Sequence, residues 1–144
     1  MNMHEKDTDK LVHSLKQAED FQTIFSETRQ YVIDQTLKNY LAYWLSDKQL
    51  SKSAVLKKAG IAEATGYQYF DGKRNPSREK VIALTIGLEL TLEETNELMK
   101  KTGYAQLYPK HPWDAVVIYG ISHGLPIPEI DDYLYNENLK TFGE

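Results

Sequence analysis

The sequence of 144 residues contains no cysteine. This absence excludes disulfides, thiol catalysis, iron–sulfur clusters and cysteine-based zinc sites. No apolar run approaches the ~20 residues that a membrane-spanning helix needs. The polar residues 1–10 also lack the apolar core of a secretory signal peptide. We therefore expect a cytoplasmic protein that has no membrane partner.

The motifs of common enzyme and metal sites are absent as well. The chain has no G-x-S-x-G sequence, no P-loop and no G-x-G-x-x-G sequence. Its four histidines are scattered, and none shares a metal-binding spacing such as H-E-x-x-H with a second ligand. We therefore expect no enzymatic activity, no metal site and no cofactor.

The formal net charge of -4 is distributed unevenly along the chain. Residues 1–46 carry a net charge of -2 and residues 81–144 a net charge of -6, whereas residues 47–80 carry eight basic and four acidic side chains. A basic middle between acidic flanks fits a surface that binds a polyanion such as DNA. A solvated surface with unevenly placed charges explains the same pattern, so charge alone does not decide between the two.

The spacing of apolar residues predicts an all-α protein. Short helices are predicted over residues 9–17 and 19–26. The next helix has apolar residues at the i, i+3, i+4, i+7 and i+8 positions of one face, and Asp34 is its expected N-cap. These apolar residues are Leu37, Tyr40, Leu41, Trp44 and Leu45. No stretch alternates with a period of two for long enough to predict a strand.

Local capping signals divide the rest of the chain into short helices. Ser51 and Ser77 are expected N-caps, and Gly60 is an expected helix end. Thr91 and Glu94 form the pattern of a capping box. The predicted elements are a helix from Ser51 to Gly60, a helix at 62–70, a loop from Gly72 to Ser77, a helix from Ser77 to near Gly87, a helix from Thr91 to Gly103, an extended or turned segment at 108–112, and helices at 113–123 and 126–135.

The segment 50–77 carries the motif that points to a function. It reads LSKSAVLKKAGI at 50–61 and, after a short predicted helix, GKRNPS at 72–77. This segment resembles the lambda-repressor-like (Cro and XRE) helix-turn-helix family of small bacterial regulators. The resemblance implies a five-helix DNA-binding module over residues 34–89. It leaves an N-terminal helical extension at 1–33 and a C-terminal helical extension at 90–144.

The spacing within this segment also has a physical meaning of its own. A helix-turn-helix needs a sharp turn between two closely packed helices. Gly60 supplies backbone freedom for that turn, and Ile61 supplies an apolar side chain beneath it. The second helix can then enter the major groove of DNA, which is about 12 Å wide.

The resemblance implies two sets of DNA-binding residues. On the second helix, Gln68 can pair with adenine and Glu63 can accept a hydrogen bond from cytosine N4. The complete set expected to face the bases is Glu63, Ala64, Tyr67 and Gln68. Phosphate contacts are expected from the turn, the loop and the following helix start. They would be made by Lys52, Lys73, Arg74, Asn75, Ser77 and Arg78.

Four positions depart from the usual family pattern. Lys52 replaces a polar residue that is usually Gln, and Leu56 replaces a small alanine. Ala62 stands where the family has a Ser or Thr cap, and Gly66 stands where it has a branched aliphatic residue. A glycine inside a helix costs about 1 kcal/mol relative to alanine. Of the aromatic cluster at 67–70, at least one ring is expected in the core.

Two classes of function follow from these observations. The first is a sequence-specific transcriptional regulator that binds double-stranded DNA, with a homodimer as its simplest assembly. The alternative is an interaction module that keeps the helix-turn-helix fold and binds a protein partner without binding DNA specifically. The predicted helix at 113–123 is apolar nearly all round, which fits either a buried core helix or a dimer or partner surface.

Overall fold

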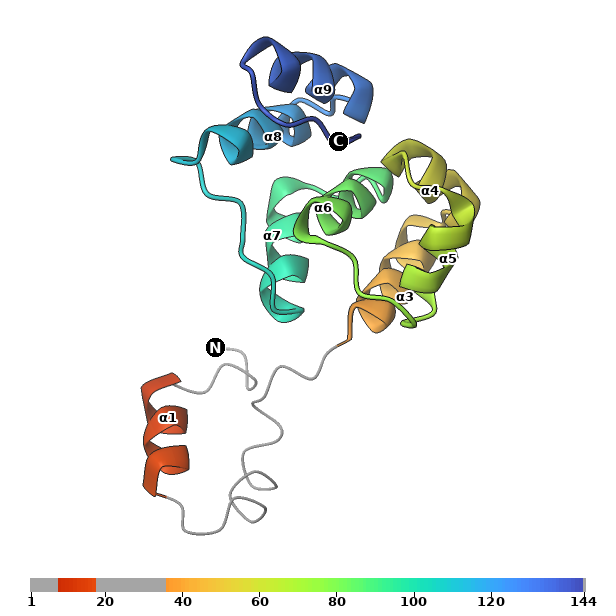
Figure 1. Cartoon of the computed structure of the whole chain (residues 1–144). Coiled ribbons are helices and arrows are strands. Elements are labelled where there is room, and N and C mark those ends of the chain that lie inside the picture. Colours follow the sequence, from red (N-terminus) through yellow and green to blue (C-terminus); the bar gives the residue numbers. More distant parts are fainter. Residues whose placement is uncertain (1–7, 18–35, 144) are drawn as a thin grey trace. The chain divides into compact units, whose positions relative to one another are not determined.

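The computed structural model describes residues 8–17 and 36–143, and every regular element within these ranges is an α-helix (Figure 1). The predicted all-α class is therefore confirmed. The chain divides into two compact units, residues 1–34 and 35–144. The first unit contains α1 (Thr8–Gln17). The second contains α3 (Leu37–Lys48), α4 (Lys52–Ala59), α5 (Glu63–Phe70), α6 (Arg78–Gly87), α7 (Leu92–Lys101), α8 (Pro112–Ser122) and α9 (Ile127–Asn136).

The first unit contributes one described helix. Helix α1 matches the helix predicted at 9–17, and it has Asp9 in its first turn and Lys16 in its last turn. Both charges are placed favourably relative to the helix dipole. Its apolar residues Val12 and Leu15 are exposed. The second predicted helix, at 19–26, lies outside the described residues.

Helix α3 begins later than the sequence indicates. Its N-cap is Thr36, whose Oγ1 accepts a hydrogen bond from the Asn39 N–H at 3.3 Å. The prediction of Asp34 as the N-cap was wrong, because the capping residue must stand directly before the first helical residue, which is Leu37. None of the described helices has the length and apolar character that a bilayer crossing requires.

Three later helices begin where the capping residues predict. The hydroxyl oxygens of Ser51, Ser77 and Thr91 each accept a hydrogen bond from the N–H three residues further on, at 3.1–3.3 Å. Glu94 returns a bond to the Thr91 N–H at 2.9 Å, which completes the predicted capping box. Such caps contribute about 1 kcal/mol each. Local interactions therefore set the starts of α4, α6 and α7.

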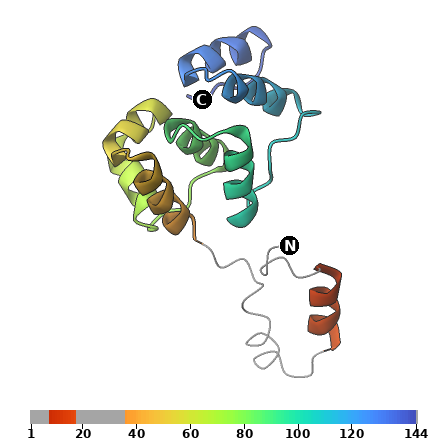
Figure 2. The same ribbon diagram turned by 180° about the vertical axis from the view of Figure 1, so that it is seen from behind.

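The core of the second unit is shared by helices that are distant in sequence. Helix α6 packs along α4, and α5 contacts both α3 and α4 (Figure 2). Partly buried aromatic and aliphatic residues of α3, including Tyr40 and Trp44, surround the buried cluster. The large, fully buried apolar side chains of this region are Leu41, Val55, Leu56, Val81, Ile82, Leu84, Leu88, Leu98 and Met99.

The C-terminal helices α8 and α9 lie side by side in both views and belong to the same unit (Figures 1 and 2). Helix α8 buries Val117 and Gly120 and leaves Tyr119 exposed, so it combines a core face with an open face. The final residues fold back over this pair. The Trp113 Nε1–H donates to the Lys140 carbonyl at 2.9 Å, and the Trp113 ring contacts Phe142.

Candidate nucleic-acid interface

A tight turn joins α4 to α5. Gly60 adopts the left-handed conformation at φ 70°, and its N–H donates to the carbonyls of Leu56 and Lys57. The next N–H, that of Ile61, donates to the Leu56 carbonyl at 3.0 Å while the Ile61 side chain is buried. Both predicted roles are confirmed. The turn is short enough that α5 begins at Glu63.

Close packing of α5 on α4 explains two of the departures from the family pattern. A Cβ atom at Gly66 would lie only 2.8 Å from Leu56 Cγ and closer still to its methyl carbons. The large Leu56 side chain therefore occupies the space that a side chain at position 66 would fill. Compared with the pattern of the family that this segment resembles, small at 56 and large at 66, this chain has the reverse, which amounts to an exchange of volume between the two positions.

Helix α5 separates its residues into a buried face and an exposed face. Gly66, Tyr69 and Phe70 are buried, so the expectation that part of the aromatic cluster lies in the core is confirmed. The four residues expected to face the bases are all exposed, with 38% exposure for Tyr67. They are Glu63, Ala64, Tyr67 and Gln68, which follow one another at helical spacing along one side of α5.

Glu63 makes a contact within the protein. Its Oε1 accepts a hydrogen bond from the Ser53 hydroxyl at 2.6 Å, which links the first turn of α5 to the first turn of α4. Ala62, the N-cap of α5, supplies no side-chain bond of its own. Glu63 thus has a structural role in addition to the base contact expected of it, because one carboxylate oxygen is already engaged.

An exposed loop continues directly from α5. The Lys73 N–H donates to the Gln68 carbonyl at 3.0 Å, which holds the loop against the end of the helix. Lys73, Arg74, Asn75 and Ser77 are exposed. Lys52 is exposed as well, and its Nζ lies 5.7 Å from the centre of the Phe70 ring at the end of α5. Five of the six predicted phosphate contacts are therefore exposed, and two of them, Lys52 and Lys73, contact the C-terminal end of α5.

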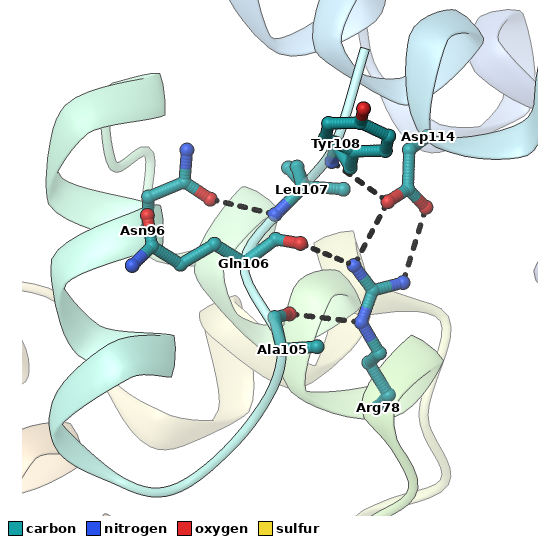
Figure 3. A network of polar contacts seen from close by, with 7 residues as sticks. All are labelled: Arg78, Asn96, Ala105, Gln106, Leu107, Tyr108 and Asp114. Carbon is teal, nitrogen blue, oxygen red and sulfur yellow. Dashed lines mark hydrogen bonds and ion pairs between the residues drawn. The ribbon is translucent and has the colours of Figure 1, made fainter. Parts of the chain in front are cut away.

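Arg78 is the predicted phosphate contact that the structure places elsewhere (Figure 3). Its Nη1 and Nη2 donate to the two carboxylate oxygens of Asp114 at 3.1 and 3.0 Å. Its Nε and Nη2 also donate to the carbonyls of Ala105 and Gln106, both at 2.9 Å. A guanidinium group that is already directed at four acceptors is not presented to a phosphate. The predicted role of Arg78 is therefore corrected to a structural one.

Asp114 is the buried partner of this arginine. It lies in the first turn of α8 and is 5% exposed. Burial alone would raise the pKa of its carboxyl, but hydrogen bonds from Arg78 and from the Tyr108 N–H lower that pKa below its ordinary value. The ionised carboxylate therefore fastens α8 to the start of α6.

Two further bonds hold the segment between α7 and α8, one to α7 and one to the end of the exposed loop. The Leu107 N–H donates to Asn96 Oδ1 at 2.9 Å (Figure 3). The Tyr104 hydroxyl donates to the carbonyl of Pro76 at 2.7 Å. Burial, with a contribution from Tyr69, raises the pKa of Tyr104, so this hydroxyl remains a donor at neutral pH. The end of the exposed loop is thereby held by the C-terminal half of the chain.

Lys38 is a candidate phosphate contact that the sequence analysis does not include. Its side chain passes beside Gly72, and together with Arg74 and Asn75 it lines a hollow of ≈ 560 Å³. Asp71 lines the same hollow and offsets part of the positive charge. Lys38 lies on α3, more than thirty residues before the loop, so neither spacing nor local pattern could associate the two.

Among the described residues, no group of three His, Asp or Glu side chains is placed to hold a metal ion. Comparisons of the chain with family models, with curated proteins and with solved structures found no match.

Proposed function

We propose that this protein is a sequence-specific DNA-binding transcriptional regulator of the lambda-repressor-like helix-turn-helix type, with α5 as its recognition helix. One observation carries the proposal. The exposed face of α5 is polar and continues, through a backbone hydrogen bond at its end, into an exposed loop that carries Lys73 and Arg74. A projecting helix beside exposed cations is the arrangement that major-groove readers use.

The residues divide into two roles. Gln68 would read adenine through its amide, and Ala64 would contact a thymine methyl group. Tyr67 and Glu63 complete the reading face. Phosphates would be bound by Lys52, Lys73, Arg74 and Asn75, by the free N–H groups at the α6 start beside Ser77, and by Lys38. In a homodimer, two copies of α5 would read half-sites about 34 Å apart.

A second candidate function is supported by a different surface. The acidic C-terminal third and its exposed tyrosines fit an adaptor that binds another protein. The carboxylate of Glu63 on α5 and the pI of ≈ 5.6 also favour this alternative. The DNA-binding function uses α5 and its loop, whereas the adaptor function uses α8 and α9 and needs no specific DNA binding.

The test is a salt titration of binding to sheared genomic DNA. Each phosphate contact contributes about -0.9 to the slope of log K against log salt. Lys73→Ala with Arg74→Ala should weaken binding to every sequence alike and flatten the slope by about one unit or more. The matched control is Lys110→Ala with Lys140→Ala, which removes the same charge outside the loop. Equal slopes for the wild type and the loop variant would remove this loop from the interface.

A further inference from the structure

Helices α8 and α9 form an open apolar groove of ≈ 470 Å³. Ala115, Val116 and Tyr119 line it from α8, and Tyr133 lines it from α9. Leu139 closes one side of it. This volume lies within the range of sites that bind small molecules or single side chains of a partner.

Two tyrosines dominate the groove. The rings of Tyr119 and Tyr133 meet edge to face, with centroids 5.5 Å apart, and each residue is nearly half exposed. The His123 ring also packs against Tyr119, with ring centroids 4.2 Å apart. Tyrosines with an apolar ring and a polar tip are enriched in protein interfaces. Since their contacts with each other hold the rings in place, binding would order little additional structure.

The rim of the groove is acidic. Glu129 stands one turn before Tyr133 on α9, and Glu137, the C-cap residue of α9, stands four residues after Tyr133 and lines the groove. The sequence over 112–144 contains six carboxylates and a single lysine. Two copies of this surface would bring like charges together, whereas a basic segment would be attracted to it.

We propose that the α8–α9 groove is the docking site for a short basic segment of a partner protein, which places an apolar or aromatic side chain between Tyr119 and Tyr133 and its lysines or arginines beside Glu129 and Glu137. This proposal does not depend on DNA binding, because its residues lie outside α5 and its loop. It specifies the partner of the second candidate function by the chemistry that the groove recognises.

The experiment selects peptides from a random display library on the full-length chain and measures their affinities by fluorescence anisotropy. Enriched peptides should combine a net positive charge with at least one large apolar residue. Their affinity should fall about tenfold or more in Tyr119→Ala with Tyr133→Ala, as expected for the centre of an interface. Glu137→Lys, a change at an exposed side chain, should weaken them as well and tests the groove without altering its tyrosines.

Two control variants match these changes. Tyr135→Ala removes a tyrosine from α9 that is 73% exposed and does not line the groove. Asp132→Lys reverses a charge on α9 outside the groove. Both should bind the selected peptides within about twofold of the wild type. Lys73→Ala with Arg74→Ala should do the same, which separates this result from that of the DNA-binding test.

Three outcomes would overturn the proposal. One is that no peptide is enriched, and another is that the enriched peptides are neutral or acidic or bind the tyrosine variant unchanged. The third comes from sedimentation of the wild-type chain at micromolar concentration. A dimer that Glu137→Lys or Tyr133→Ala dissociates would show that a second copy, and not a basic segment, occupies the groove.

Discussion

In the α4–α5 pair, Gly66 lies against the Leu56 side chain, and in the α8–α9 pair Gly120 lies against Ile130. A Cβ at Gly120 would come within 2.6 Å of the Ile130 Cδ1 atom. In both pairs the missing side chain lets a short helix approach an aliphatic residue on its neighbour. Helices of only 8–11 residues can thereby pack closely against each other.

The two pairs differ in the side chains that they expose to solvent. Helix α5 keeps Tyr69 and Phe70 in the core and exposes Gln68 beside a basic loop. The α8–α9 pair exposes Tyr119 and Tyr133 beside carboxylates. The same kind of glycine contact thus occurs beneath two different exposed faces, so the packing contact does not determine the character of the surface. A similar contact can support a polar surface suited to DNA or an aromatic, acidic surface suited to protein.

The largest effect on stability is expected from changes to the contact between Leu56 and Gly66 in the α4–α5 pair. Leu56→Ala removes a fully buried side chain and should lower the free energy of unfolding by about 2–5 kcal/mol. Gly66→Val alone should destabilise by overpacking. Combined, the two changes place a small residue at 56 and a large one at 66, so the new side chain can occupy the space that Leu56 vacates and the double variant should recover at least about 1 kcal/mol of the summed losses. Urea denaturation measures all three variants.

The second pair supplies the control for this exchange. Ile130→Ala should also destabilise by about 2–5 kcal/mol, since Ile130 is fully buried. Gly66→Val should not compensate for it, because the two contacts share no residue. Strict additivity of Leu56→Ala and Gly66→Val would contradict the volume exchange that we infer.

The next largest effect concerns the bond that joins the two halves of the unit. Arg78→Ala leaves the carboxylate of Asp114 buried without its partner and should destabilise by about 3 kcal/mol. Arg74→Ala is the matched control, and its effect should stay within about 0.5 kcal/mol because Arg74 is exposed. Chemical denaturation compares the two. If Arg78→Ala lowered the free energy of unfolding as little as Arg74→Ala does, Arg78 would have no structural role.

A smaller effect, on the free energy of DNA binding, should distinguish the exposed face of α5 from that of the α8–α9 pair. Gln68→Ala should cost about 1–3 kcal/mol of DNA-binding free energy at one preferred base pair and relax the choice there. Tyr133→Ala, in the other pair, should leave the DNA preference unchanged. Selection of binding sites from random DNA measures both variants. An identical preferred site for Gln68→Ala and the wild type would exclude Gln68 from base reading.

The smallest effect is expected in the pH dependence of stability. Because the pKa of Asp114 is lowered in the folded state, its ionised form stabilises the fold above its unfolded pKa of about 3.9. This stabilisation is lost as the pH falls through the lower, folded pKa. Asp114→Asn should therefore lose less stability than the wild type between neutral and acidic pH. Parallel pH profiles from thermal unfolding would contradict a dominant contribution from this carboxylate.

Features determined within a few residues could be predicted from the sequence. Ser51, Ser77 and Thr91 cap the helices that they were expected to cap, and Gly60 ends α4. Each acts on backbone groups three to four residues away, so the pattern contains both partners. The failure at α3 is of the same local kind. Two residues with capping side chains stood near its start, and the pattern did not identify which one precedes the first turn.

Features determined by distant residues could not be predicted. Asp114 is 36 residues from Arg78, and no local pattern in the sequence associates the two. The proximity of Lys38 to the loop has the same origin. Gly66 illustrates a further limit. The sequence shows that a glycine at this position lowers the stability of the helix. Only the packing shows that Leu56 fills the space beside it.

The hydrogen bonds of Arg78 also bear on how this chain can change in evolution. The guanidinium needs the carboxylate of Asp114 together with the carbonyls of Ala105 and Gln106. A lysine has neither the planar fork nor the number of donors in fixed directions to replace it. The α8–α9 pair could therefore be exchanged by recombination with that of another protein only if the incoming segment brought its own acid and the preceding turn. The acid and the connector would be inherited together, and the recipient would have to supply the arginine.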